Sequence, residues 1–277
     1  MSATPSVVDH YTRGNLLERL SAALADDGID PLHPDQDALA PYDHFHGRGL
    51  EATDDLANRL SVDATDHILD VGCGIGGPAR YMASRFGCRV TGIDLTGEFC
   101  DVARYLNGLL HLKELVAVEK GNALQMPFGD ASFDGAYSMN VSMNITDKPA
   151  LYTELKRVLK PGAWLVLSEM AQGPGGDVEF PTPWASSAET SFLSTPEATR
   201  AGLEAAGFAV SSLRDTTKEA KDYGARSRAL VEQGEKPPHR AVRLIHGETA
   251  DQASTNTARG LAEGRLIPIE VTCLKPH

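Results

Sequence analysis

A glycine-rich loop near residue 70 is the part of this sequence that most directly suggests chemistry. The loop, DVGCGIGG at residues 70–77, follows an apolar run predicted as a strand over 67–73 and opens a predicted helix over 78–86. Glycine permits a tight turn and lets a ligand touch the backbone where a Cβ would intrude. We therefore predict a ligand at the carboxyl end of this strand, bound in part by Gly72, Gly74 and Gly76.

Two further polar residues end the next two predicted strands, over residues 89–95 and 115–121. Asp94 ends the first of them, and Asn122 follows the second. A carboxylate in the position of Asp94 can accept hydrogen bonds from ribose hydroxyls, and the Asn122 amide can face an adenine ring. The loop also satisfies the dinucleotide pattern G-x-G-x-x-G, so a nicotinamide dinucleotide stays open at this point. The structural alternative is a glycine turn that binds no ligand.

The segments that must position these residues alternate between strand and helix patterns. Further strands are predicted over residues 133–139 and 163–170, and further helices over 97–111 and 148–158. Strands separated by helices of this length predict a parallel sheet with helices on both faces, a Rossmann-like α/β fold. Residues that follow different strands of such a sheet meet at its carboxyl edge.

The flanking segments are less regular. We predict a helix over 7–25, a loop over 28–41, a helix over 50–60, a loop over 173–183, a helix from 194 to 207, a strand over 208–215, broken helix over 218–263 and a strand over 267–274. This pattern divides the chain into an N-terminal helical lid and loop (1–49), a core (50–217 and 264–277) and a helical insertion (218–263) that serves as lid or interface. Removal of residues 1–27 is expected to leave a folded protein.

Four stretches of the chain resemble a known family. They are ILDVGCGIGG, VTGIDL, GNALQMPFGDASFDGAYS and ELKRVLKPGAWLVLSE, all between residues 66 and 170. They are similar to class I S-adenosylmethionine-dependent methyltransferases of the ubiquinone-biosynthesis and sarcosine/dimethylglycine type, a resemblance that covers about residues 40–275. It implies a seven-stranded, mostly parallel sheet whose last strand is antiparallel. Asn122 departs from the many relatives that carry aspartate there, although an amide can still donate to an adenine ring nitrogen.

S-adenosylmethionine suits the acidic residue at the start of the loop. Asp70 places a carboxylate where the ammonium group of this cofactor would lie, which favours S-adenosylmethionine, with S-adenosylhomocysteine as product, over a dinucleotide. We expect three more residues to contact the cofactor, namely Leu95, Ala123 and Asn140.

The resemblance also implies residues that act on the acceptor. Relatives with an F-H-x-x-G segment place it over the methionine end of the cofactor, which points to Phe45, His46 and Gly49. His46 is a candidate base or hydrogen-bond donor, and packing against the first helix is its structural alternative. Tyr11 resembles a lid tyrosine, whose aromatic face would be favourable near a sulfonium.

Small polar residues follow the fourth strand, where the acceptor pocket of a methyltransferase opens. Asn144 is a candidate to bind the acceptor, together with Asn140 and Ser142, although these residues could instead cap the next helix. Trp184 is expected to line the pocket or to close the edge of the core. The insertion carries His239 and His246, which are expected at the surface.

Composition limits the partners. The 277 residues carry 26 basic and 38 acidic side chains, a formal net charge of −12, and no basic cluster, so we expect no nucleic-acid partner. The chain contains neither an apolar run long enough to span a membrane nor the features of a signal peptide, which predicts a cytoplasmic protein without membrane contact. The cysteines lack paired spacing and are expected to be free and buried, and no metal site is predicted, although His44 and His46 lie close in sequence.

The expected activity is methyl transfer to a small soluble acceptor. The acidic balance favours a neutral or cationic acceptor and N-methylation of an amine, although Arg48 could clamp a carboxylate. O- or C-methylation, a nicotinamide-dependent oxidoreductase and a non-catalytic S-adenosylmethionine-binding protein are the alternatives. A homodimer is a further expectation.

Overall fold

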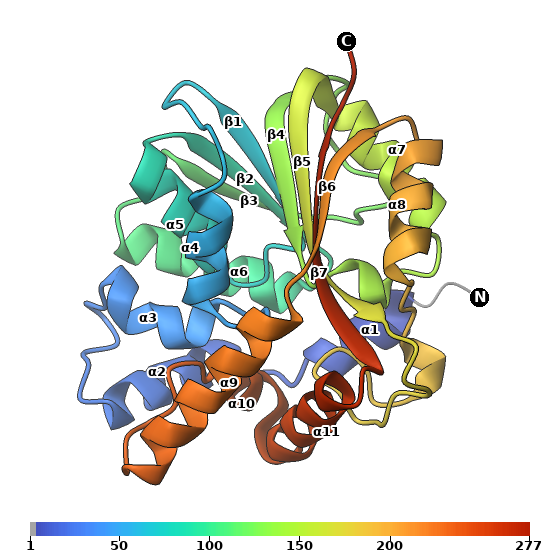
Figure 1. Ribbon diagram of the computed structural model, residues 1–277. Coiled ribbons are helices and arrows are strands. Elements are labelled where there is room, and N and C mark those ends of the chain that lie inside the picture. The colour runs from blue at the N-terminus through green and yellow to red at the C-terminus, as the bar shows by residue number, and fades with distance from the viewer. Residues whose placement is uncertain (1–3) are drawn as a thin grey trace.

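A computed structural model of the protein describes residues 4–277, which fold around one seven-stranded sheet (Figure 1). The strand order is β3-β2-β1-β4-β5-β7-β6. The strands are β1 (His67–Val71), β2 (Arg89–Asp94), β3 (Val116–Lys120), β4 (Phe133–Met139), β5 (Leu159–Gln172), β6 (Ala209–Asp215) and β7 (Leu266–Leu274). Strands β3, β2, β1, β4 and β5 pair in parallel, and β7 is antiparallel to both β5 and β6. The predicted mostly parallel sheet with an antiparallel last strand is confirmed.

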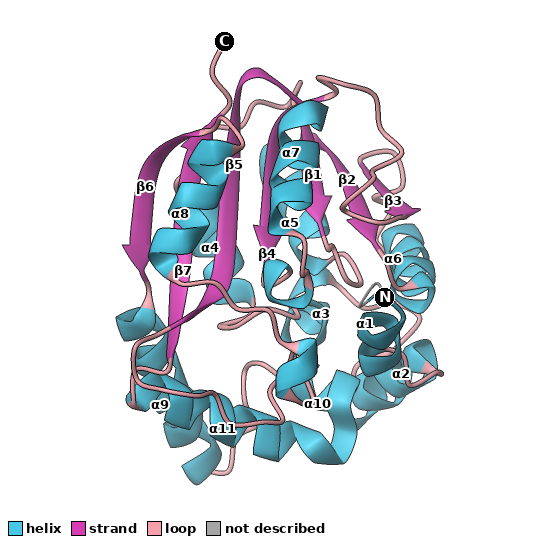
Figure 2. Ribbon diagram, turned by 90° about the vertical axis from the view of Figure 1, so that its right-hand side faces the viewer, coloured by secondary structure: helices cyan, strands magenta, loops and turns pink. Residues whose placement is uncertain are grey.

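Helices cover both faces of the sheet (Figures 1 and 2). One face carries α4 (Leu50–Ala57), α5 (Gly77–Phe86) and α6 (Gly97–Leu109), and the other carries α7 (Lys148–Val158) and α8 (Pro196–Ala205). Strand β1 is buried from its second residue onward because it is covered on both sides. Leu69 packs toward the α7 and α8 face, whereas its neighbour Ile68 packs with α5 on the other.

A third group of helices gathers at the edge where the parallel strands end (Figures 1 and 2). These are α1 (Thr4–Tyr11), α2 (Leu16–Asp26), α3 (Gln36–Asp43), α9 (Thr217–Glu232), α10 (Ala241–His246) and α11 (Ala250–Ala262). Short 3₁₀ turns occur at Ser142–Asn144, Ala188–Thr190 and, between α10 and α11, Gly247–Thr249. We call this group the helical layer. It joins the N-terminal segment to the insertion, which the sequence predicted as separate parts.

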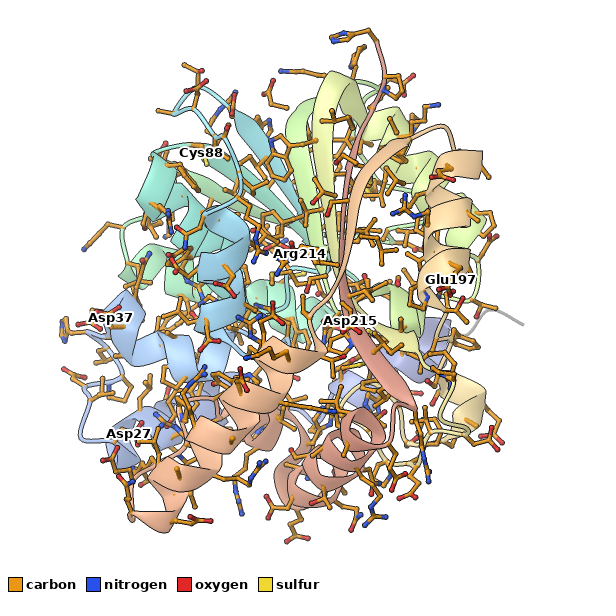
Figure 3. The ribbon with its side chains drawn as sticks, in the orientation of Figure 1. Asp27, Asp37, Cys88, Glu197, Arg214 and Asp215 are labelled. Atoms are coloured by element: carbon orange, nitrogen blue, oxygen red, sulfur yellow. The ribbon has the colours of Figure 1, made fainter. Side chains whose placement is uncertain are left out.

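The helical layer has a core of its own. Leu16, Leu20 and Leu24 of α2 are each at most 1% exposed and share one apolar cluster with Leu244 and Ile245 of α10. Helix α2 is therefore part of the packed core, and the expectation that residues 1–27 can be removed is not supported for α2. At the rim, Asp27 (labelled in Figure 3) accepts from Arg240 at 2.6 Å, which ties the end of α2 to α10.

Three predicted boundaries are wrong. The helix predicted over 7–25 is two helices, because Gly14 and Asn15 adopt left-handed backbone with φ of 73° and 56°. The loop predicted over 28–41 ends early: α3 begins at Gln36, where the Asp35 side chain accepts from the Ala38 N–H at 2.8 Å and caps the helix. Strand β5 begins at Leu159 and so includes Pro161 and Gly162, which lie between the predicted helix over 148–158 and the predicted strand over 163–170.

The early start of β5 has a local reason. Leu159 pairs with Phe133, and the register then shifts so that Trp164 pairs with Gly135. The extra residues on β5 include Gly162, whose φ of 80° suits a bulge.

Candidate active site

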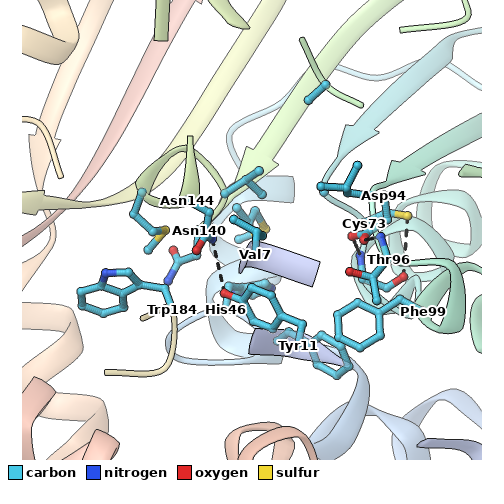
Figure 4. Close-up of a pocket in the computed structure, with 18 of the residues that line it drawn as sticks. Val7, Tyr11, His46, Cys73, Asp94, Thr96, Phe99, Asn140, Asn144 and Trp184 are labelled. Atoms are coloured by element: carbon cyan, nitrogen blue, oxygen red, sulfur yellow. Dashed lines mark hydrogen bonds between the residues drawn. The ribbon is translucent and has the colours of Figure 1, made fainter. Parts of the chain in front are cut away.

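A cavity of about 440 Å³ lies between the carboxyl edge of the sheet and the helical layer (Figure 4). Two sets of residues form most of its lining. The glycine-loop half follows β1, β2 and β3 and comprises residues 70, 72–74, 93–96 and 121–124. The acceptor-side half comprises Val7, Tyr11, Asn140, Val141, Met143, Asn144, Pro183, Trp184, Val242, Ile245 and His246. Figure 4 shows Asp94 on one side and Trp184 on the other, with Tyr11 between them.

The loop glycines are required by the protein itself. Gly72 and Gly74 have φ of 73° and 53°, a region that L side chains rarely adopt. A Cβ on Gly72 would overlap the Val141 side chain, and one on Gly74 would lie 2.9 Å from the ring of Phe45. Gly76 also has a positive φ, but it does not line the cavity, and a Cβ there would meet Arg80. Sequence reasoning assigned this space to a ligand, whereas much of it is filled by side chains of the chain.

The Asp94 carboxylate fixes the loop and faces the cavity. Its Oδ2 accepts from the Gly74 N–H at 2.9 Å, and its Oδ1 accepts from the Thr96 N–H at 2.8 Å. Burial raises the pKa of Asp94, and these two N–H donors act to lower it. Each oxygen keeps further acceptor capacity. The group can therefore accept from two further hydroxyls, and its binding of a ribose stays a prediction.

Asp70 is a buried acid at the end of β1. Its side chain is 2% exposed and accepts from the Tyr137 hydroxyl at 3.0 Å. Burial raises the pKa of Asp70 to about 7, with a smaller contribution from the charge of Asp94. A cationic ligand group beside this carboxylate would relieve that unfavourable charge burial. The position thus fits an ammonium group.

Asn122 has a free donor at the third strand end. Its Oδ1 accepts from the Leu124 N–H at 2.9 Å, so the amide is oriented by its own turn. The Nδ2 makes none of the hydrogen bonds found among residues 4–277 and is available to a ring nitrogen. Leu95 and Ala123 line the cavity nearby, and their contact with a cofactor stays a prediction.

His46 lies in the cavity wall with both ring nitrogens engaged by the protein. Nε2 lies 3.0 Å from Thr53 Oγ1, and Nδ1 lies 3.2 Å from the Gly47 carbonyl. Burial lowers its pKa well below the usual value, so the ring is neutral at neutral pH. His44 contacts the same Thr53 hydroxyl at 2.9 Å. These contacts favour the structural alternative for His46, and its role toward an acceptor stays a prediction.

Tyr11 and Asn144 meet across the cavity although they lie far apart in the chain. The Asn144 amide donates to the Tyr11 hydroxyl at 3.3 Å, and the Tyr11 ring packs edge-on against Phe99. Burial raises the pKa of Tyr11, so its hydroxyl stays protonated. Asn140 also lines the cavity, but Ser142 does not.

Two side chains, those of Glu169 and Lys148, hold the segment after β4 through its backbone. Ser142 donates its N–H to both Glu169 oxygens at 3.2 and 3.1 Å, and burial raises the pKa of Glu169 to about 7. Lys148 Nζ donates to the carbonyls of Ser142, Ile145 and Phe192 at 2.8, 3.0 and 2.6 Å. Ser142 therefore positions the segment through its backbone rather than facing the cavity.

Three other expectations are corrected or resolved. His246, predicted at the surface, is 8% exposed and lines the cavity, and its ring centroid lies 5.0 Å from that of His10. The apolar pattern AVRLIH of α10 is the signal that could have shown its burial. Arg48 does not line the cavity and pairs with Glu51 and Asp55, so it cannot clamp a carboxylate there. Trp184 lines the cavity and donates to Ser191 at 2.9 Å.

The remaining predictions concern cysteines, metals and membranes. The four cysteines are free and buried, as predicted. Over residues 4–277, no three His, Cys, Asp or Glu side chains are grouped so that they could hold a metal ion. None of the helices in that range has the length and apolar character needed to cross a bilayer.

Comparison with known proteins identifies the central region. Residues 69–167 match the family model described as a methyltransferase domain. Over 122 residues the chain is 36% identical to the O-methyltransferase cnsE of Penicillium expansum, a match that covers 44% of each protein. Other matching relatives are named as sterol C-methyltransferases and a phosphoethanolamine N-methyltransferase, so the matches include methylation of oxygen, carbon and nitrogen. The chain spans between 30% and 57% of the length of the first three curated relatives.

Solved structures share the fold over most of the chain. A geranyl diphosphate methyltransferase in complex with GPP and sinefungin superposes with a TM-score of 0.74 at 16% identity and covers 99% of both chains. A putative sarcosine dimethylglycine methyltransferase from Galdieria sulphuraria gives a TM-score of 0.67 at 18% identity, over 82% of this chain and 86% of the other. At these identities the likeness concerns the fold, including the helical layer in the first case.

Proposed function

Because residues 69–167 match the family model of a methyltransferase domain, we propose that the protein transfers a methyl group from S-adenosylmethionine to a small molecule. The observation that carries this proposal is the cavity itself. It joins Asp70, Asp94 and Asn122 at the strand ends to Tyr11 and Asn144 on the acceptor side within one continuous space. A methyltransferase needs such a space because donor and acceptor must meet.

The residues of the glycine-loop half fit S-adenosylmethionine by their chemistry. Asp70 would hold the ammonium group, Asp94 the ribose hydroxyls and the Asn122 amide an adenine ring nitrogen. Gly72, Gly74, Leu95 and Ala123 would line the same site, joined by Asn140 from the acceptor-side half, and Gly76 would shape the loop from outside it. When bound, this cofactor supplies a methyl group already activated by its positively charged sulfur.

The chain therefore has to position the acceptor and exclude water rather than provide a nucleophile. Holding two reactants in line can lower a barrier by roughly 7–11 kcal/mol. We assign this task to Tyr11 and Asn144, which close the cavity through their mutual hydrogen bond, and to the fixed neutral ring of His46. Helix α1, which carries Tyr11, would open and close as a lid.

Within this reaction class we propose an amine nitrogen as the methyl acceptor, ahead of oxygen or carbon. The formal charge of −12 and the Asp147 carboxylate in the cavity wall favour a neutral or cationic acceptor over an anion. The same charge argues against a nucleic-acid partner. The cytoplasmic location and the homodimer stay predictions.

Calorimetry followed by a transfer assay tests the proposal. We expect S-adenosylhomocysteine to bind with micromolar affinity, about −8 kcal/mol, and NAD to give no heat. Radiolabelled S-adenosylmethionine is then incubated with panels of amines, alcohols, phenols and activated carbon acids. Binding of NAD without S-adenosylhomocysteine would overturn the reaction class. Cofactor binding without transfer to any panel member would favour the non-catalytic alternative.

A further inference from the structure

The acceptor-side half of the cavity has mostly apolar walls. Val7, Met143, Trp184, Val242 and Ile245 come from four separate segments and face the same space. The polar residues of this half, Tyr11, Asn140, Asn144 and His246, are uncharged at neutral pH. Burial lowers the pKa of His246 to about 4 and raises the pKa of Tyr11. Apolar walls with few polar groups favour an apolar ligand body by removing its surface from water.

No Lys or Arg occurs among the described residues that line the cavity. Three basic side chains of the surrounding elements are engaged elsewhere. Lys148 donates to three carbonyls, and Arg80 pairs with Asp43 at 2.8 Å and with Asn107 at 3.0 Å. Arg48 pairs with Glu51 and Asp55. Arg13 lines an adjoining hollow that shares only His246 with the cavity.

A carboxylate adds to this selectivity. Asp147 lies in the wall, so an anion would enter a space that offers an acidic group and no basic one. Asp43 is paired with Arg80, and Asp70 and Asp94 are assigned to the cofactor. Burying an anion without a cationic partner is strongly unfavourable. Arginine and lysine, the side chains most used for phosphate and carboxylate recognition in proteins, are the ones that this lining lacks.

We propose that the methyl acceptor has an apolar body and carries no phosphate, sulfate or carboxylate on the part that the cavity encloses. The inference rests on the proposed function, because it names the substrate class of the same site. It separates this chain from the matched structure that binds GPP, a diphosphate, despite the shared fold.

Two fluorescent probes that differ by one charged group test the proposal. N-phenyl-1-naphthylamine is uncharged, and 8-anilinonaphthalene-1-sulfonate is the same ring system with a sulfonate. Each is titrated into the full-length protein saturated with S-adenosylhomocysteine, so that the acceptor-side half is the space that remains. We expect the neutral probe to bind at least about tenfold more tightly than the sulfonate.

A lysine placed in the wall should reverse this preference. Val242 is a half-buried residue of α10 that lines the cavity, so Val242→Lys adds a cation where the sulfonate would enter. Its matched control is Val231→Lys, the same charge change on α9, at a residue that is 50% exposed and outside the lining. Val242→Lys should change the ratio of the two dissociation constants by about tenfold toward the sulfonate, and Val231→Lys by less than about twofold. Melting temperature and S-adenosylhomocysteine binding verify that both variants fold.

Each outcome decides the matter. Equal or tighter binding of the sulfonate to the unaltered protein overturns the inference, even if Val242→Lys fails to fold. If neither probe binds while S-adenosylhomocysteine does, the acceptor side does not accept an apolar body, and the inference falls while the proposed function stands. If S-adenosylhomocysteine itself does not bind, the proposed function falls first and takes the inference with it.

Discussion

Replacement of Asp94 by asparagine tests whether the glycine-loop half binds the cofactor, because it alters the two carboxylate oxygens assigned to the ribose. The carboxylate accepts one backbone N–H on each oxygen, from Gly74 at 2.9 Å and from Thr96 at 2.8 Å. The Asp94→Asn substitution would keep the shape of the side chain but turn one acceptor into a donor, which would then face a backbone N–H. The charge that strengthens hydrogen bonds to two ribose hydroxyls would be lost as well.

The magnitude follows from these contacts. Hydrogen bonds to a charged group contribute about 1.5–3 kcal/mol, which corresponds to a weakening of S-adenosylhomocysteine binding by about 10- to 150-fold. The fold should persist, because Asp94 lies at a strand end and not in an apolar cluster. Isothermal titration calorimetry measures the dissociation constant, and thermal melting checks the fold.

The control removes the same charge from the surface of the next helix. Asp101→Asn on α6 alters a side chain that is 80% exposed and paired only with Arg104, so binding should change by less than about twofold. A folded Asp94→Asn protein that binds as tightly as this control would refute the reasoning and place the ribose elsewhere.

Three other predictions follow from the same structure. The pKa of Asp70 is raised to about 7, and an ammonium group needs the ionised acid. S-adenosylhomocysteine should therefore bind about tenfold more weakly at pH 6 than at pH 8. Calorimetry should show a smaller pH dependence in Asp70→Asn, and an unchanged dependence would contradict the role of Asp70. Deletion of residues 1–14, which removes α1, should leave a cooperative melt but abolish most methyl transfer. Deletion of 1–27 should prevent folding, because each buried leucine of α2 contributes about 2–5 kcal/mol to stability. A normal melt of the longer deletion would show that residues 1–27 are a detachable lid after all. Gly72→Ala should lower the free energy of unfolding by about 2 kcal/mol or more, as measured by denaturant titration. Adding Val141→Ala should recover part of this loss, and no recovery would show that the strain comes from the backbone alone.

The glycine-loop half was predictable because its signals are local. Asp70, Asp94 and Asn122 each stand within a few residues of an apolar strand, and a parallel sheet brings such strand ends together. The break before α2 could also have been predicted, because Gly14 and Asn15 are the residue types that accept left-handed backbone most readily.

The acceptor side was less predictable because its contacts are long-range. Tyr11 meets Asn144 across 133 positions, and His246 enters the wall only because α10 packs on α2. The fixed position of the His46 ring depends on the Thr53 hydroxyl, and burial lowers its pKa; no spacing rule supplies either. Periodicity predicts which helices are amphipathic but not which apolar faces pair with one another.

The shared core of α2 and α10 has a consequence for synthesis on the ribosome. Leu16, Leu20 and Leu24 emerge early, whereas Leu244 and Ile245 emerge more than 200 residues later. At translation rates of about 5–20 residues per second, these leucines wait roughly 10–40 s for part of their covering. The five parallel strands and the loop that faces the cofactor can form during this interval, whereas β7, which emerges after Ile245, and the wall facing the acceptor cannot. The nascent protein would therefore form the part of the site that binds the cofactor before the part that selects the acceptor. Until α10 covers it, the apolar face of α2 is a target for chaperones.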